Sequence, residues 1–160
     1  HGMPKRNLLQ GDPYFCECQK TARLTAELLG LSDEQWMLTF QSRFGKQEWL
    51  KPYTDKTLEQ LPKDGVKRVA IVCPAFSADC LETLEEIAVE NRDIFLAAGG
   101  ETFNYIAALN DRPDHIDALA ELARRHMQGW PELDDSWNVS HASRDAEASL
   151  ARAKALGAKS

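Results

Sequence analysis

The sequence predicts an α/β fold: a parallel, doubly wound sheet with helices on both faces. Segments of strand character alternate with segments of helical character along the chain. The central segment, residues 66–73, is apolar and β-branched almost throughout, as in parallel strands that are buried on both faces. Only three strands are evident, which is few for such a sheet, so we expect a further strand immediately before His1.

The composition fits one globular domain, residues 1–133, followed by a polar tail, residues 134–160. The chain has 160 residues, 43% hydrophobic and 28% charged, enough for a sizeable core. Its net charge of −6 argues against a nucleic-acid partner or an anionic membrane surface, since both select clustered Lys and Arg. No apolar run approaches the roughly 20 residues of a membrane helix. We expect a cytoplasmic protein with peripheral membrane contact at most, and a chain that is part of a longer one.

The first elements follow from periodicity and from helix-ending residues. Residues 15–29 favour a helix that Gly30 ends. Residues 36–42 favour a strand. An irregular, aromatic-rich connection then leads to Thr54, an N-cap residue type, and to a short helix over residues 56–61.

The central strand ends at Pro74 and leads into an acidic helix that we expect to reach about residue 98. The elements expected after it are a strand over residues 102–106, a helix over residues 115–127 that Pro113 introduces, and a tail helix near residues 144–156.

The acidic helix has two distinct faces when its residues are placed at helical spacing. One face carries the carboxylates of Asp79, Glu82, Glu86, Glu90 and Asp93. The other carries the apolar side chains of Leu81, Leu84, Ile87, Ala88 and Phe95. The carboxylates thus begin just past the carboxyl end of a parallel strand, where open α/β sheets bind their ligands.

Two interpretations of these carboxylates are open on spacing alone. Asp79 and Glu82 have the spacing of a capping box, and the stripe as a whole resembles a solvated helix face. Alternatively, the carboxylates accept protons or bind a cation. Spacing alone favours the structural interpretation, because surface helices commonly carry such stripes, and helical geometry does not decide between the two.

The remaining candidate residues are isolated. His1 has ring nitrogens that suit Fe²⁺, Zn²⁺ or a proton, although a lone histidine is usually a polar surface group. Arg43, Trp49 and Tyr53 are candidates for an apolar ligand site, although a loop Trp more often packs as an anchor. The four cysteines match no standard zinc or iron–sulfur spacing and are expected to be reduced thiols. Nucleotide-binding and serine-hydrolase motifs are lacking.

Five motifs appear in one order along the chain: HGMPKR, GDPYFCEC, FQSRFGKQEWLKPYTDKTLEQL, GVKRVAIVCPAFSADCLETLEEI and GGETFNYIAALN. In this set the chain resembles the C-terminal half of the protoporphyrin ferrochelatase family, in particular its bacterial branch. The resemblance covers residues 1 to about 122. It implies a Rossmann-like, chelatase-type sheet, one of two similar halves. It also implies the last step of haem synthesis, in which this lyase inserts Fe²⁺ into protoporphyrin IX.

The resemblance implies roles for individual residues. His1 and Glu82 take the positions of the catalytic, metal-binding histidine and glutamate, and Asp79 and Glu86 those of a proton or metal path. Trp49 takes the position of a residue beside the porphyrin. Cys80 departs from the family, where many members have histidine, and this leaves the path less certain here.

The resemblance also implies the partners of the chain. They are protoporphyrin IX, Fe²⁺ as substrate and the N-terminal half of the same enzyme. No tightly bound cofactor and no iron–sulfur cluster are expected, and the chain alone is expected to be inactive. Two alternatives stay open: a chelatase for another tetrapyrrole or metal, and a non-catalytic module that binds metal or tetrapyrrole.

Overall fold

The computed structural model describes residues 1–159 and divides into two compact units, His1–Asp111 and a second unit that begins at Arg112. The elements of the first unit are α1 (Lys5–Leu9), α2 (Tyr14–Leu29), the 3-10 turn η1 (Asp33–Gln35), α3 (Thr54–Gln60), β1 (Arg68–Val72), the π-helix η2 (Glu82–Asn91), α4 (Arg92–Ala97) and β2 (Thr102–Ile106). Those of the second are α5 (Pro113–His126), the 3-10 turn η3 (Pro131–Leu133) and α6 (Val139–Ala155).

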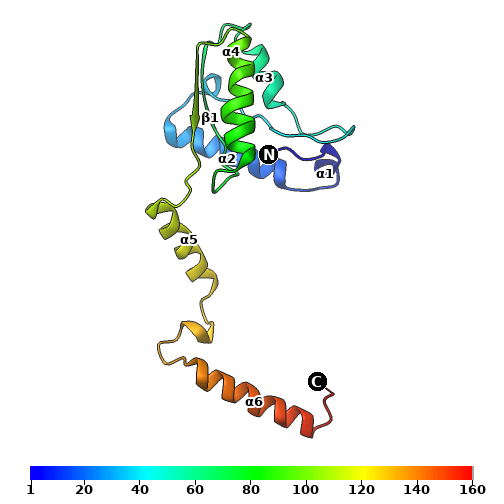
Figure 1. The fold of residues 1–160 in the computed structure, drawn as a ribbon, viewed down its shortest axis with the longest axis vertical. Coiled ribbons are helices and arrows are strands. Elements are labelled where there is room, and N and C mark those ends of the chain that lie inside the picture. Colours follow the sequence, from blue (N-terminus) through cyan, green and yellow to red (C-terminus); the bar gives the residue numbers. More distant parts are fainter. Residues whose placement is uncertain (160) are drawn as a thin grey trace. The chain divides into compact units, whose positions relative to one another are not determined.

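The centre of the first unit is a strand–helix–strand motif. β1 and β2 pair in parallel, from Arg68 opposite Thr102 to Val72 opposite Ile106, and the continuous helix η2–α4 connects them (Figure 1). Two of the three predicted strands, and the helix between them, are confirmed. The result is a small parallel sheet with helices, and the described residues do not form the full doubly wound sheet.

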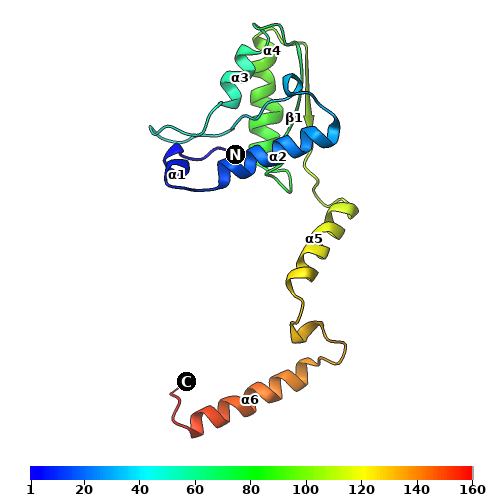
Figure 2. The same cartoon turned by 180° about the vertical axis from the view of Figure 1, so that it is seen from behind.

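The helices of the first unit lie on opposite sides of it. In Figure 1 the η2–α4 helix is in front, with α3 beside it, whereas α2 lies in front when the unit is seen from behind (Figure 2). Helix α2 ends as predicted, because Gly30 adopts the left-handed conformation with φ of 67°. The side chains of Phe40, Leu50, Leu58, Ile87 and Phe95 are the most deeply buried large apolar ones.

The strand expected over residues 36–42 is wrong. Only Phe40 forms a bridge, with Tyr53: its N–H donates to the Pro52 carbonyl, and its own carbonyl accepts from the Thr54 N–H. Beyond it, Ser42 has a left-handed backbone with φ of 60°, which cannot continue an extended strand. The segment therefore pairs with the loop that follows it and not with the sheet.

The N-cap predicted at Thr54 is also wrong. Helix α3 begins at Thr54 itself, and Tyr53 precedes it in an extended conformation. The Thr54 hydroxyl lies 2.8 Å from the Thr39 hydroxyl, so it connects the helix to the preceding segment and does not cap it.

The acidic helix differs from its expected form because η2 is a π-helix. The buried residues along η2–α4 are Thr83, Ile87, Asn91 and Phe95, four residues apart, as expected of turns wider than those of an α-helix. Leu81 and Leu84, which α-helical spacing places on the apolar face, are 79% and 51% exposed. The predicted apolar face is therefore correct at Ile87 and Phe95 and wrong at its first turn.

The second unit consists of α5, η3 and α6, and none of the residues in these elements is buried. Helix α5 begins with Pro113 as predicted. Helix α6 extends further toward the N-terminus than residue 144, because Asn138 caps it by accepting from the Ser140 and His141 N–H groups. No helix in the described part of the chain is long and apolar enough to span a membrane.

Candidate active site between the His1 segment and helix η2

The segment that begins at His1 is fixed against two loops. The Gly2 N–H donates to the Gln41 carbonyl at 2.7 Å, and the Leu50 N–H donates to the Met3 carbonyl at 2.9 Å. A Cβ atom on Gly2 would lie 3.0 Å from the Ser42 carbonyl oxygen and 3.3 Å from the Trp49 ring. The chain can therefore approach this closely because residue 2 is glycine.

His1 presents a ring whose hydrogen bonding defines its tautomer. Its Nδ1 lies 2.7 Å from the Gly2 carbonyl oxygen, and a carbonyl can only accept, so Nδ1 carries the hydrogen. Nε2 of the neutral ring then has a lone pair for a proton or a metal ion. Tyr14 stabilises the main chain here, because its hydroxyl donates to the His1 carbonyl at 2.8 Å.

Trp49 lies beside this histidine and is buried, with 9% of its surface exposed. The two ring centroids are 6.2 Å apart, and Phe44 contacts the indole from another direction at 6.0 Å. The indole N–H donates to the Phe44 carbonyl at 3.0 Å. Trp49 therefore anchors the loop and borders the His1 ring.

Glu86 is connected to the His1 segment through residues 41 and 42. Its carboxylate accepts from the Ser42 N–H at 2.7 Å, from the Ser42 hydroxyl, and from the Gln41 side-chain amide at 3.2 Å. The Gln41 carbonyl accepts from Gly2, as described above. The structure thus brings Glu86, predicted as part of a proton or metal path, next to the segment that carries His1.

The orientation of the Gln41 amide is determined by its neighbours. Its NH₂ group faces two acceptors, the Glu86 carboxylate and the Glu82 main-chain carbonyl, the latter at 2.6 Å. Its oxygen accepts from the Cys73 thiol at 3.5 Å. Burial raises the pKa of Cys73 to about 11, so the thiol keeps the hydrogen that this contact needs.

Glu82 occupies the first position of η2, and its side chain is exposed. A hydrogen bond with Cys80 lowers the pKa of its carboxyl group. Among the described residues, its link to the His1 segment runs through its main-chain carbonyl and Gln41, and no hydrogen bond joins the two predicted catalytic side chains directly. Its position one turn before Glu86 places both carboxylates on the same helix.

Asp79 is held by four donors and not by a capping box. Its carboxylate accepts from the Tyr105 hydroxyl at 2.6 Å and the Asn110 amide at 2.9 Å; the others are the Thr83 hydroxyl and the Ala108 N–H. These hydrogen bonds lower the pKa of Asp79 to about 2, and the bond from Tyr105 contributes most. The capping box predicted with Glu82 is wrong, because η2 has Leu81 at its N-cap and no side-chain cap. Asp79 instead connects the turns that follow β1 and β2.

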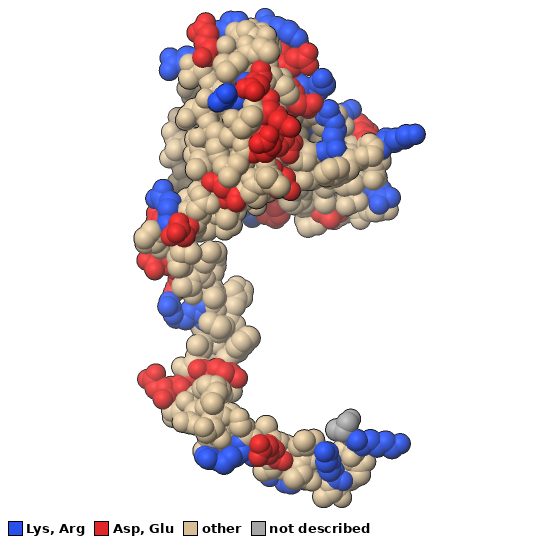
Figure 3. Space-filling view, in the orientation of Figure 1, with Lys and Arg blue, Asp and Glu red and all other residues tan. Residues whose placement is uncertain are grey.

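The acidic stripe is visible on the surface. Figure 3 shows acidic side chains gathered along the η2–α4 helix; the stripe contains Glu82, Glu86, Glu90 and Asp93. Within residues 1–159, no group of three or more His, Cys, Asp and Glu side chains converges as a metal site.

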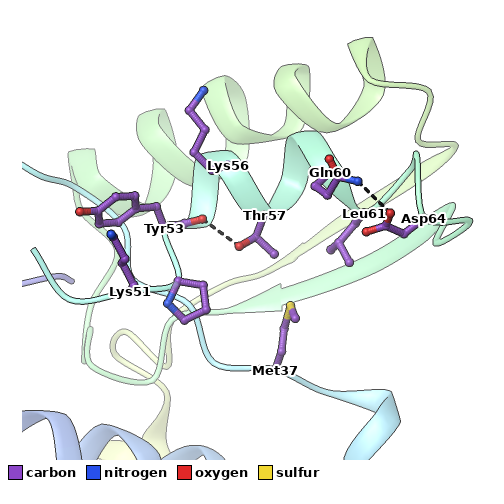
Figure 4. A pocket seen from close by; sticks show the side chains of 9 residues that line it. Met37, Lys51, Tyr53, Lys56, Thr57, Gln60, Leu61 and Asp64 are labelled. Carbon is purple, nitrogen blue, oxygen red and sulfur yellow. Dashed lines mark hydrogen bonds between the residues drawn. The ribbon is translucent and has the colours of Figure 1, made fainter.

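An open cavity of about 360 Å³ lies elsewhere, between α3 and the segments before it (Figure 4). Tyr53, Lys51 and Met37 are among its lining residues, and Trp49 is not. Arg43 lies 4.2 Å from the centre of the Tyr53 ring and forms an ion pair with Asp55 at 2.8 Å. This cavity is thus lined by Tyr53 without Arg43 or Trp49, although Tyr53 contacts both of these residues.

Several residues that contact the candidate carboxylates were not singled out from the sequence, and four of them matter most here. They are Gln41 and Ser42, which bind Glu86, and Tyr105 and Asn110, which bind Asp79. All four lie in motifs of the family resemblance, Gln41 and Ser42 in one and Tyr105 and Asn110 in another, and that was the only available signal. The partners of Asp79 are 26 and 31 residues away in sequence, and no periodicity reveals such contacts.

Comparison with known proteins places these features in one family. A sequence model of the family described as ferrochelatase matches residues 1–127. The ferrochelatase of Thioalkalivibrio sulfidiphilus is 59% identical over 159 residues, which are 99% of this chain and 43% of that protein. The ferrochelatases of Nitrosococcus oceani and Alcanivorax borkumensis are 57% and 63% identical, over 99% and 81% of this chain and 43% and 38% of their own lengths. The chain therefore spans less than half the length of these relatives, and it belongs to the ferrochelatase family.

Proposed function

We propose that this chain supplies one part of a metal chelatase, a lyase that inserts Fe²⁺ into protoporphyrin IX. The observation that carries the proposal is the hydrogen-bonded connection of the His1 segment to Glu86 on an acidic π-helix, in a chain of the ferrochelatase family. π-Helical segments are rare and frequently lie at functional sites, and η2 has this form over Glu82–Asn91, which supports placing the chemistry here.

The residue types suit the reaction. Metallation of a porphyrin removes two pyrrole N–H protons while a cation arrives, so a base and a metal ligand must act at one place. In this proposal the free Nε2 of His1 takes a pyrrole proton or contacts the iron. Glu82 exchanges protons or metal with solvent because it is exposed, and Glu86 connects it to the His1 segment.

Two further residues support these groups. Trp49 borders the porphyrin and keeps the His1 ring in place through the ring contact described above. In this proposal Asp79 is the fixed end of the same path, and it stays ionised near neutral pH because its pKa is about 2.

The other part of the active site comes from the remainder of the enzyme. The chain spans 43% of the Thioalkalivibrio protein, and we propose that it forms one of two doubly wound halves with the porphyrin in the cleft between them. A second candidate function, a module that binds metal or tetrapyrrole without turnover, is favoured by this same partial coverage.

An exchange chimera tests the proposal. In it, the matching 159 residues of the Thioalkalivibrio ferrochelatase are replaced by this chain. We expect the chimera to insert Fe²⁺ into protoporphyrin IX, measured by haem absorbance. Glu82→Gln should lower kcat by at least about a hundredfold, because the exposed carboxylate is lost, while the circular dichroism spectrum stays unchanged.

Glu101→Gln is the matched control, because Glu101 is an exposed carboxylate outside the stripe. Full activity of Glu82→Gln would contradict the role of Glu82. A folded chimera that binds porphyrin without inserting metal would favour the binding module. Preference for Co²⁺ in a competition assay would indicate a different metal substrate.

A further inference from the structure

Residues 41 and 42 contact both parts of the proposed site. The main chain of Gln41 accepts from Gly2, and the side chain of Gln41 and two groups of Ser42 donate to Glu86. Ser42 also has φ of 60°, a conformation that non-glycine residues rarely adopt and that is common at functional sites. This backbone directs both the N–H and the hydroxyl of one residue to one carboxylate.

We propose that Gln41 and Ser42 are positioning residues that hold the Glu86 carboxylate beside the His1 segment. This inference rests on the proposed function. A glutamate on a helix surface has several rotamers and loses little by pointing into solvent. Three donors from one dipeptide select a single rotamer, and that dipeptide is itself fixed to Gly2. The distance between Glu86 and the His1 segment is thereby set before any substrate arrives.

The chemistry of the donors supports positioning over simple helix docking. All three are neutral, so they orient the carboxylate and leave its negative charge in place for a passing proton or cation. An ion pair with Lys or Arg would fix the helix equally well but would cancel that charge. Cys73 completes the arrangement, because its thiol keeps the Gln41 amide turned with its NH₂ toward Glu86.

The first test measures metal insertion by the exchange chimera. Ser42→Ala and Gln41→Met each remove a donor, and we expect kcat to fall about tenfold or more with an unchanged KM for porphyrin, since misplacement of a reacting group lowers the rate of the chemical step. Gln47→Met and Ser149→Ala change exposed residues of the same types and should have no effect.

A double-mutant cycle separates positioning from stability. On a Glu86→Ala background, Ser42→Ala should cause no further loss of kcat, because it acts only through Glu86. Full activity of both single variants, or an additional loss that multiplies with that of Glu86→Ala, would overturn the inference while the proposed function stands.

A second measurement does not depend on activity. In the ¹⁵N-labelled chain, the Ser42 amide proton should resonate downfield because it donates to a carboxylate, and Glu86→Gln should move this signal. Glu82→Gln should leave it in place. An inactive wild-type chimera would overturn the proposed function. The Ser42 amide signal would then test the positioning inference by itself, and an unchanged chemical shift in Glu86→Gln would contradict that inference.

Discussion

Asp79 and Glu82 are three residues apart in sequence and have different environments. Asp79 accepts four hydrogen bonds from groups in β2, in the turn after β2 and in η2, whereas Glu82 is exposed and has Cys80 as its side-chain partner. Sequence spacing could place both carboxylates near the end of β1, and it did so correctly. It could not distinguish them, because the difference depends on Tyr105 in β2 and Asn110 after it, which are distant from Asp79 in sequence.

The hydrogen bonds of Asp79 predict a pH dependence of stability. Its pKa is about 2 in the folded chain and about 3.9 in an unfolded chain. A depressed pKa stabilises the folded state above the unfolded value, and this stabilisation is lost as the pH falls from about 4 to about 2. Urea unfolding at a series of pH values should show the loss in the wild type and a weaker one in Asp79→Asn.

Tyr105→Phe provides a graded control for this prediction. It removes the donor that contributes most to the lowered pKa and leaves the carboxylate, so its acid-side slope should lie between those of the wild type and Asp79→Asn. Identical slopes in all three proteins would show that these hydrogen bonds do not govern acid stability.

The η2–α4 helix shows what could and could not be predicted for an element. Its existence, its acidic side and its position between two parallel strands followed from local patterns in the sequence. Its π-helical form did not, because it depends on which side chains are buried: Thr83 and Asn91 are buried polar residues on the core side, and the Asn91 amide donates within the helix to the Glu86 carbonyl at 2.7 Å. The segment 36–42 failed for a similar reason, since the backbone of Ser42 is fixed by Glu86.

Close packing at the end of α4 gives a prediction for Gly100. A Cβ atom there would lie 2.2 Å from Cε1 of Phe95, whose ring is fully buried and packs 6.1 Å from Phe103. Gly100→Ala should therefore lower the free energy of unfolding by about 1–3 kcal/mol through overpacking, as measured by urea denaturation.

Phe95→Leu is the partner variant for a double-mutant cycle with Gly100→Ala. The smaller side chain opens space for the added methyl group, so the double variant should be more stable than the sum of the single effects predicts. Strict additivity would show that the methyl group does not contact the ring.

At the scale of the whole molecule, the sheet of the first unit has one open face. The residues of β1 and β2 alternate between half-buried and exposed, although parallel strands are normally covered on both faces. The sequence of β1 predicted such a cover. The η2–α4 helix packs against the sheet on one side, and α2, on the opposite side of the unit, leaves the other face of the strands partly exposed. A chain that spans 43% of a relative is consistent with a site that needs further protein surface.

The isolated chain is therefore expected to lack turnover. Zinc insertion into a water-soluble porphyrin, followed by fluorescence, should give the background rate for the 160-residue chain and a clear rate for the exchange chimera. The physical reason is that a bound macrocycle needs walls on both of its faces to exclude water during metal transfer. Turnover by the chain alone, at a rate near that of the chimera, would show that one part is sufficient.

The hydrogen bonds of Glu86 limit how protons and metal ions can move through the proposed site. A carboxylate offers about four lone-pair positions, and three already accept hydrogen bonds from Ser42 and Gln41. The one remaining lone-pair position can bind either a proton or a metal ion, so Glu86 binds the two at different times. An outgoing proton must therefore leave this position before an incoming cation can bind there. Proton transfer and metal transfer at Glu86 then occur one after the other.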